Sequence, residues 1–129
     1  MDHYVDGFVF PVSRDGLDIY RIVAQSGADI WTEHGALEYS EFVIDDPDFP
    51  GTRSFVELVQ ASAAEVVVIG WIKFASRESR DLVHKKVAAD PRMPHLIAPL
   101  TDPANPVFDA TRMAYGGFHP LVQSTQKDA

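Results

Sequence analysis

Cysteine is absent from the 129 residues of this chain. The absence excludes a disulfide framework, a thiolate metal site and a cysteine nucleophile. Positive charge is scarce, since 11 lysine and arginine residues stand against 19 aspartate and glutamate residues, which gives a formal net charge of -8. Binding to nucleic acid phosphates or to an anionic membrane surface requires clustered positive charge. We therefore expect neither nucleic acid nor a membrane among the partners of this protein.

Long apolar runs are also missing. No apolar stretch approaches the ~20 residues needed to cross a bilayer, and the first three residues lack the basic and apolar regions of a secretion signal. We expect a cytoplasmic protein. A length of 129 residues suits one domain with a true core. We assign that domain to residues 1–123 and expect residues 124–129 to form a frayed tail.

Several sequence motifs of enzymes are absent as well. The chain has no HExxH, no GxSxG, no P-loop and no dinucleotide fingerprint, and none of its histidines lie four residues apart. The acidic, proline-containing segment at residues 45–51 does not fit an EF-hand. We expect no metal site and no cofactor.

Residues 31–39, WTEHGALEY, connect a helical pattern to a strand pattern. Upstream of them, apolar residues recur three or four apart, which is the spacing of one buried helical stripe: Leu17, Tyr20, Val23, Ala24, Ala28 and Trp31. Gly35 is expected to end this helix, because glycine takes the left-handed conformation at little cost. A cationic His34 would suit the negative end of the helix dipole. Ser13 is the expected N-cap, with Asp15 in the first turn.

Strand patterns occupy residues 4–12, 36–44, 65–74 and 112–122. The third of these is apolar without alternation, so we place it in the middle of a sheet. In the last strand, Gly116 and Gly117 suggest a bulge or a close approach by another backbone. Residues 54–64 fit neither a helical nor a strand period.

A second helix follows the third predicted strand. Ser76 is its expected N-cap and Asp90-Pro91 its end, because the residue before proline is pushed out of the helical region. Its buried side is expected to hold Leu82, Val83, Val87 and Ala88. Residues 92–106 contain four prolines and predict a loop with one helical turn near residues 95–98.

The order strand, helix, strand, strand, helix, strand is that of the ferredoxin-like βαββαβ fold, an α+β architecture. In this fold two helices cover one face of a four-stranded antiparallel sheet. Because the first and third strands carry apolar residues on both faces, the second face also needs a cover. We expect a copy of the same face there, in a homodimer formed by sheet-to-sheet packing. Alternatively, residues 54–64 fold over the face of their own subunit.

Three side chains are candidates for catalysis: Asp6, His34 and Tyr115. Asp6 lies among aromatic residues on the first strand, where a carboxylate could act as a general acid or base. It could equally pair with an arginine such as Arg112. His34 lies three residues after Trp31, a spacing that could place both at the mouth of a pocket between helix and sheet. The alternative is that Trp31 is core and His34 only a helix cap.

Aromatic residues are the candidates for ligand binding. Phe8, Trp31 and Trp71, with Tyr115, could line a cavity for a flat apolar molecule. Aromatic residues of central strands are more often simply part of the core, so this interpretation competes with a purely structural one.

Four segments together resemble a known family: residues 4–9 (YVDGFV), 31–39 (WTEHGALEY), 90–93 (DPRM) and 113–118 (MAYGGF). They resemble the YbaA-like family of small bacterial proteins, a domain of unknown function. The resemblance covers nearly the whole chain and implies the fold of the dimeric α/β-barrel superfamily. That superfamily includes cofactor-free monooxygenases, haem-degrading oxygenases, lactone isomerases and binding-only members. Two positions depart from the family pattern: Lys73 interrupts an apolar strand, and His119-Pro120 closes the last strand early.

Two functions remain open. In the first, a homodimer binds or transforms a small apolar or aromatic molecule in a cleft between helices and sheet, as a cofactor-free oxygenase or isomerase does. In the second, the protein is a non-catalytic dimeric module that recognises a protein partner, through its acidic loop or through residues 54–64.

Overall fold

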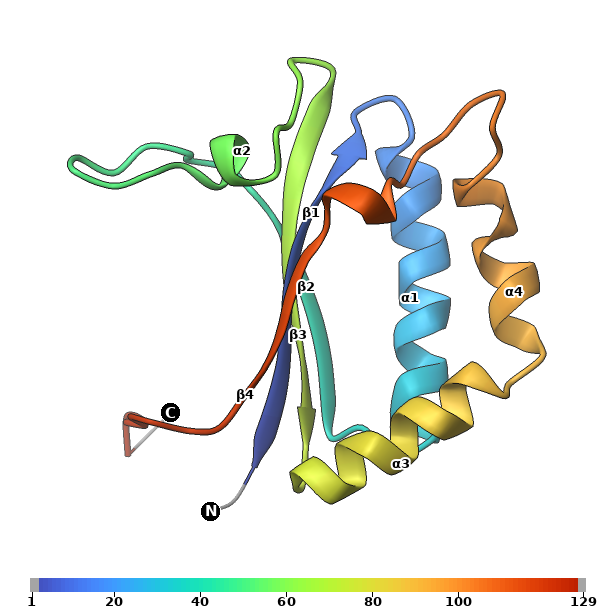
Figure 1. Cartoon of the computed structure of the whole chain (residues 1–129), viewed down its shortest axis with the longest axis vertical. Coiled ribbons are helices and arrows are strands. Elements are labelled where there is room, and N and C mark those ends of the chain that lie inside the picture. Colours follow the sequence, from blue (N-terminus) through green and yellow to red (C-terminus); the bar gives the residue numbers. More distant parts are fainter. Residues whose placement is uncertain (1–2, 128–129) are drawn as a thin grey trace.

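A four-stranded antiparallel sheet forms the centre of the molecule, and long helices cover only one of its faces (Figure 1). The computed structural model describes residues 3–127. The strands are β1 (Tyr4–Ser13), β2 (Glu38–Val43), β3 (Glu65–Phe74) and β4 (Ala114–Phe118), in the spatial order β2-β3-β1-β4. Helices α1 (Leu17–Glu33), α3 (Arg77–Ala88) and α4 (Arg92–Ile97) lie on one side, and the short α2 (Phe55–Leu58) lies on the other. The ferredoxin-like α+β fold is confirmed.

Strand β3 is central, as its uninterrupted apolar run predicts. It pairs along its full length with β1 on one side, and its residues Val68 to Lys73 pair with β2 on the other. Alternation along β1 supplies both faces of the sheet. Phe10 and Val12 pack with Tyr20 and Val23 of α1, whereas Val9 packs on the opposite face.

The start of α1 differs from the sequence prediction. Gly16 is the N-cap, and no side chain caps the helix. Ser13 is instead the last residue of β1, and its backbone N–H donates to the carbonyl oxygen of Val107 at 3.1 Å. Because Ser13 is held in extended backbone by this bond, it lies too early in the chain to cap the helix.

The end of α1 follows the prediction. His34 is the C-cap, and Gly35 has a φ of 121°, a conformation that side-chain-bearing residues rarely adopt. The chain then turns directly into β2.

Helix α3 begins as predicted, since the Ser76 hydroxyl accepts the backbone N–H of Ser79 at 3.0 Å. Its buried side is narrower than predicted. Val83 and Val87 are buried, but Leu82 is 54% exposed and Ala88 is also exposed. Successive helical residues are rotated by about 100°, so a helix that touches the sheet along one line buries only positions four apart.

The proline-rich segment after α3 is more helical than predicted. It forms α4 and a following 3₁₀ turn, η1 (Ala98–Leu100), and a second 3₁₀ turn, η2 (Ala110–Arg112), precedes β4. Pro91 and Pro94 fall at the start of α4, where the missing N–H has no helical partner in any case.

Strand β4 is shorter than predicted, and it contains no bulge. Its register against β1 is continuous from Ala114, opposite Val9, to Phe118, opposite Val5. Residues 124–127 form no helix or strand, whereas residues 128 and 129 of the predicted tail lie outside the described part of the chain.

Residues 54–64 cover one end of the second sheet face. Ser54 caps the single turn of α2, and Val59 is buried against Val9 and Val67. The other end of the face is open, and Trp71 and Phe118 line a hollow of about 590 Å³ there. The segment therefore folds over part of its own sheet and leaves the rest uncovered.

Across residues 3–127, no helix combines the length and the apolar character that crossing a membrane requires.

Replacement of Gly35 by alanine is expected to destabilise the fold by about 1–2 kcal/mol, because a Cβ is strained at its positive φ. The matched substitution Gly27→Ala, inside α1, is expected to stabilise by about 0.5–1 kcal/mol, since its Cβ would make only an ordinary contact with Leu96. Urea denaturation measures both. Equal effects of the two substitutions would contradict this account of the helix end.

Acid is expected to weaken one ion pair selectively. Arg112 donates to both carboxylate oxygens of Glu65, at 2.7 and 2.6 Å, and this bonding lowers the pKa of Glu65 to about 2. A depressed folded-state pKa contributes stability that is complete above the unfolded pKa and is lost as the pH falls towards about 2. Between pH ~4.5 and pH ~2, the unfolding free energy of Glu65→Gln should therefore fall by roughly 2–3 kcal/mol less than that of the wild type. Glu57→Gln, at an exposed carboxylate, should leave the decline unchanged.

Candidate functional site

A cavity of about 440 Å³ lies between the helices and the sheet. Its walls are mostly apolar and include Phe8, Phe10, Trp31, Ile72, Leu96 and Met113. Polar side chains enter it from two places. Asp6, His84 and Tyr115 form one polar group, and Tyr20, Tyr39 and Glu41 form the other. An apolar cavity with a few convergent polar groups has the character of a small-molecule site.

The first polar group is built around Asp6, whose side chain is only 1% exposed. The Tyr115 hydroxyl donates to its Oδ1 at 2.7 Å, and His84 Nε2 lies 2.6 Å from its Oδ2. Arg80 Nη1 lies 3.4 Å from Oδ1 and donates to the Tyr115 oxygen at 2.8 Å. The carboxylate of β1 thus joins β4 and α3, and the positive charge of Arg80 offsets the cost of burying it.

Glycine at position 117 makes this arrangement possible. Gly117 lies opposite Asp6 in the β1–β4 register, and a Cβ there would overlap the hydroxyl of Tyr4. The Tyr4 ring in turn lies 5.0 Å from the guanidinium carbon of Arg80, in a cation–π contact. The close approach that the glycine pair suggests is therefore made by an aromatic ring and not by another backbone.

His84 connects the buried carboxylate to the cavity. A carboxylate only accepts hydrogen bonds when ionised, so Nε2 carries the proton, and in the neutral imidazole Nδ1 has a free lone pair. Within residues 3–127, Nδ1 makes no hydrogen bond. The imidazole and the Trp31 ring pack in a T-shaped arrangement, with 5.2 Å between centroids. His84 is thus oriented by Asp6 and packed against an aromatic wall.

Tyr115 keeps its proton at neutral pH. Burial of the hydroxyl, together with its hydrogen bond to Asp6, raises the pKa of Tyr115 to about 12. It therefore serves as a hydrogen-bond donor that fixes the carboxylate.

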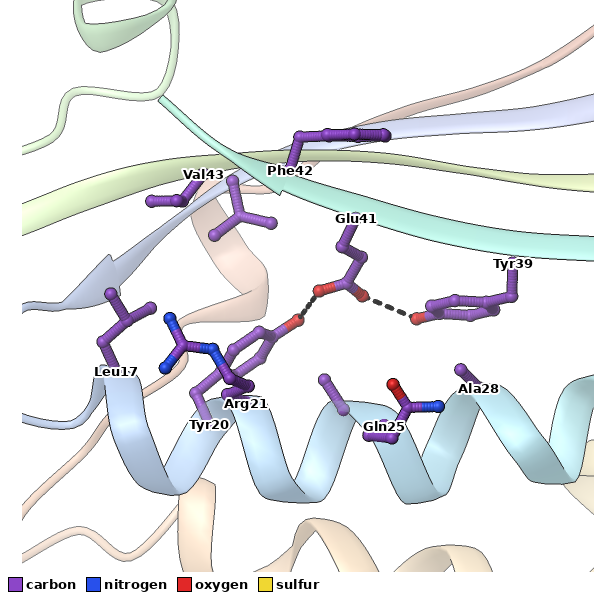
Figure 2. Close-up of a pocket in the computed structure, with 11 residues that line it drawn as sticks. Leu17, Tyr20, Arg21, Gln25, Ala28, Tyr39, Glu41, Phe42 and Val43 are labelled. Carbon is purple, nitrogen blue, oxygen red and sulfur yellow. Dashed lines mark hydrogen bonds between the residues drawn. The ribbon is translucent and has the colours of Figure 1, made fainter. Parts of the chain in front are cut away.

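The second polar group joins α1 to β2. Figure 2 shows Glu41 reaching from β2 towards α1, between the hydroxyls of Tyr20 and Tyr39. Its two oxygens accept from them at 2.5 and 2.7 Å. Burial, reinforced by the Glu41 charge, raises the pKa of both tyrosines far above the ordinary value. Both remain donors. These three side chains also line a smaller hollow of about 190 Å³ beside α1.

Of the three predicted catalytic candidates, Asp6 and Tyr115 are hydrogen-bonded to each other. His34 does not line this cavity. Its Nε2 lies 2.8 Å from Oδ2 of Asp90, at the junction of α1 with α4. Hydrogen bonds from Arg92 and from His34 lower the pKa of Asp90. His34 is therefore part of a structural ion-pair cluster at the helix end.

The predicted ligand-binding aromatics lie on different faces. Phe8 and Trp31 line the cavity. Trp71 lies on the other face of the sheet, where it stacks on Phe42 with 5.1 Å between ring centroids. Adjacent residues of a strand point to opposite faces, and Trp71 is one residue from Ile72 of the cavity wall.

One expectation about charges needs correction. Asp6 does not pair with Arg112, because Arg112 is held by Glu65 at the other end of β3. The partners of Asp6 are instead the Arg80 guanidinium and the His84 imidazole, which the sequence prediction did not name. Their spacing of four residues was an available signal, since it places both on one face of α3.

Among residues 3–127, no group of three or more histidine, cysteine, aspartate or glutamate side chains is placed to hold a metal ion.

Comparison with known proteins gives the family. The family described as "Protein of unknown function (DUF1428)" matches residues 3–109. The chain belongs to the DUF1428 family. It is 39% identical over 119 residues to the uncharacterized protein YbaA of Escherichia coli K12, a match that covers 92% of this chain and 97% of YbaA. YbaA of Shigella flexneri gives the same figures. The resemblance to the YbaA-like family is confirmed.

Solved structures with the same fold are more distant. A NIPSNAP family protein of unknown function from Agrobacterium tumefaciens superposes with a TM-score of 0.58 at 14% identity, over 95% of this chain and 91% of that protein. A variant of SnoaB, a cofactor-independent oxygenase from Streptomyces nogalater, gives 0.55 at 12% identity, over 98% and 99%. At these identities the likeness shows that the DUF1428 protein shares their fold.

Replacement of Asp6 by asparagine is expected to lower the unfolding free energy by roughly 2 kcal/mol or more, because Arg80 loses its buried counter-charge. Asp45→Asn makes the same chemical change in the exposed acidic loop and should stay within about 0.5 kcal/mol of the wild type. Urea denaturation of both variants tests this. A harmless Asp6→Asn would show that the network does not support the fold.

Proposed function

We propose that this protein binds a small, mostly apolar or aromatic molecule in the cavity between helices and sheet and takes a proton from it with His84. The observation that carries the proposal is an imidazole held by a buried carboxylate in the wall of an apolar cavity. The reaction class is that of a cofactor-free oxygenase or isomerase. Asp6 and Tyr115 retain the functional importance predicted from sequence, and His84 takes the role considered for His34.

The proposed step is a proton transfer. A C–H or O–H proton of the ligand moves to Nδ1 of His84, and the electron pair stays on the ligand. Asp6 holds the imidazole in the required tautomer and stabilises the imidazolium that forms, as the aspartate of a catalytic triad does. Tyr115 and Arg80 position Asp6 through hydrogen bonds. The apolar walls exclude water, which strengthens each of these interactions.

Two outcomes can follow the proton transfer. Return of the proton to a different carbon completes an isomerisation. Addition of the ligand carbanion to dioxygen, followed by return of the proton from His84, gives a hydroperoxide and completes an oxygenation. The second outcome has a precedent in this fold, since SnoaB is a cofactor-independent oxygenase.

A second copy of the chain is the proposed cover of the open sheet face. Ile69, Phe42 and Phe118 are 36%, 53% and 56% exposed there, beside Trp71. A contiguous apolar patch of this kind is uncommon on a soluble monomer. Because α2 covers only one end of the face, the remaining apolar end is free for sheet-to-sheet packing in a homodimer.

The alternative function, a non-catalytic module for a protein partner, predicts no enclosed cavity between helices and sheet. The cavity of about 440 Å³ therefore favours the ligand-binding function.

Anthrone, a flat aromatic carbon acid, is a suitable probe for the proton transfer. With dioxygen as oxidant it yields anthraquinone and water, and we expect the wild type to accelerate this oxidation over buffer. His84→Ala should reduce the acceleration about 100-fold or more, because a general base typically contributes that much. His95→Ala, on the exposed side of α4, serves as control. Anthraquinone absorbance gives the rate, and an unchanged rate in His84→Ala would refute the assignment of the base.

The oligomeric state tests the proposed packing. Sedimentation analysis should give twice the chain mass of 14.3 kDa for the wild type. Ile69→Lys should give a monomer, because it places a charge in the open apolar face. Ile22→Lys, at a position that is 69% exposed on α1, should remain a dimer. A monomeric wild type would exclude the homodimer.

A further inference from the structure

Glu41 and Tyr115 lie in one row across the sheet, at its two edges. The strand registers place Glu41 opposite Gly70, Gly70 opposite Phe8, and Phe8 opposite Tyr115. Neighbouring strands are about 4.8 Å apart, so the backbones of the two end residues lie roughly 14 Å from each other. Both side chains line the same cavity. The cavity thus has a polar group at each end of one sheet row.

The floor between the two ends is apolar. Gly70 has no side chain, and the Phe8 ring occupies the space above it: a Cβ at Gly70 would lie 2.6 Å from Cε2 of Phe8. Trp31 and Leu96 face this floor from the helices as part of the same cavity wall. A ligand that spans the row must therefore be apolar in its middle.

The Glu41 carboxylate has hydrogen-bond acceptor positions that are not used within the described part of the chain. It accepts two hydrogen bonds, both from neutral tyrosine hydroxyls, whereas an ionised carboxylate offers about four acceptor positions. In the described part of the chain, no ion pair includes it. Asp6, at the other end of the row, has Arg80 as a counter-charge. A carboxylate that is partly withdrawn from water without a cation is costly, so a cationic ligand group would gain most at Glu41.

We propose that Glu41 is a second anchor of the ligand site and receives the protonated amine of an elongated aromatic ligand whose other end reaches His84. Tyr20 and Tyr39 are positioning residues, because they hold the carboxylate from α1 and from β2 (Figure 2). The inference rests on the proposed function, since both use the same cavity. It narrows the substrate class from apolar molecules in general to aromatic molecules that carry a protonated alkylamine.

Three naphthalenes of similar size separate charge from shape: 1-naphthylmethylamine, 1-methylnaphthalene and 1-naphthoic acid. Nuclear magnetic resonance titration of the whole chain should show that the amine binds about tenfold more tightly than the methyl compound, as a charge-assisted hydrogen bond provides. The acid should bind more weakly than both. Glu41→Gln should abolish the preference for the amine without weakening the methyl compound.

Glu38→Gln is the matched control, because Glu38 lies on the same strand but bonds to Trp71 on the opposite face of the sheet. It should keep the preference for the amine. Tyr39→Phe should reduce the preference without abolishing it, since the carboxylate remains but loses one of the two hydroxyls that hold it. Thermal melting confirms that each variant is folded.

The outcomes distinguish this inference from the proposed function. Equal binding of the amine and the methyl compound, or a preference that survives Glu41→Gln, would overturn the anchor and leave the cavity as a ligand site. Failure of all three naphthalenes to bind the wild type would overturn both proposals. A preference that is unchanged in Tyr39→Phe would overturn the positioning role of Tyr39.

Discussion

The buried carboxylate of Asp6 is the interaction on which the rest of the site depends. It lies on a central strand, among aromatic side chains, and is stable there only because β4 and α3 bring donors to it. One charged group thus ties an edge strand and a helix to the middle of the sheet. The same bonds fix His84 against Trp31, so the requirement to satisfy a buried charge also orients a base at the wall of the cavity.

The two faces of the sheet differ in structure and in their proposed roles. The helix-covered face holds a cavity with polar groups at both ends, and the opposite face exposes a hollowed apolar surface that α2 shields only in part. Alternation along β1 supplies both, since Asp6 and Phe8 face the helices while Val5 and Val9 face away. Substitutions on one face can therefore impair ligand binding without impairing the packing of two subunits, and substitutions on the other face can do the reverse.

Much of this architecture follows from sequence patterns. The period of two along β1 predicts that Asp6 lies among aromatic side chains, and the helical stripe of α1 with Gly35 predicts the turn into β2. Contacts between side chains that are far apart in the sequence were harder to predict. Pairing of Asp6 with Arg80 and His84 depends on how α3 lies over the end of the sheet, which no local period encodes. His34 has a local explanation in the helix dipole, yet its actual partner is Asp90, 56 residues away. A four-residue helix such as α2 is too short to show a period.

The central claim is that Asp6 holds His84 as the Nε2–H tautomer, with Nδ1 available to a ligand. Nitrogen-15 resonance of the histidine rings, recorded where the imidazole is neutral, reports this tautomer directly. The account predicts a protonated Nε2 on His84 and a shift of its Nδ1 signal, but not of the His95 signals, when an aromatic ligand fills the cavity. A protonated Nδ1, or signals that do not respond to the ligand, would contradict it.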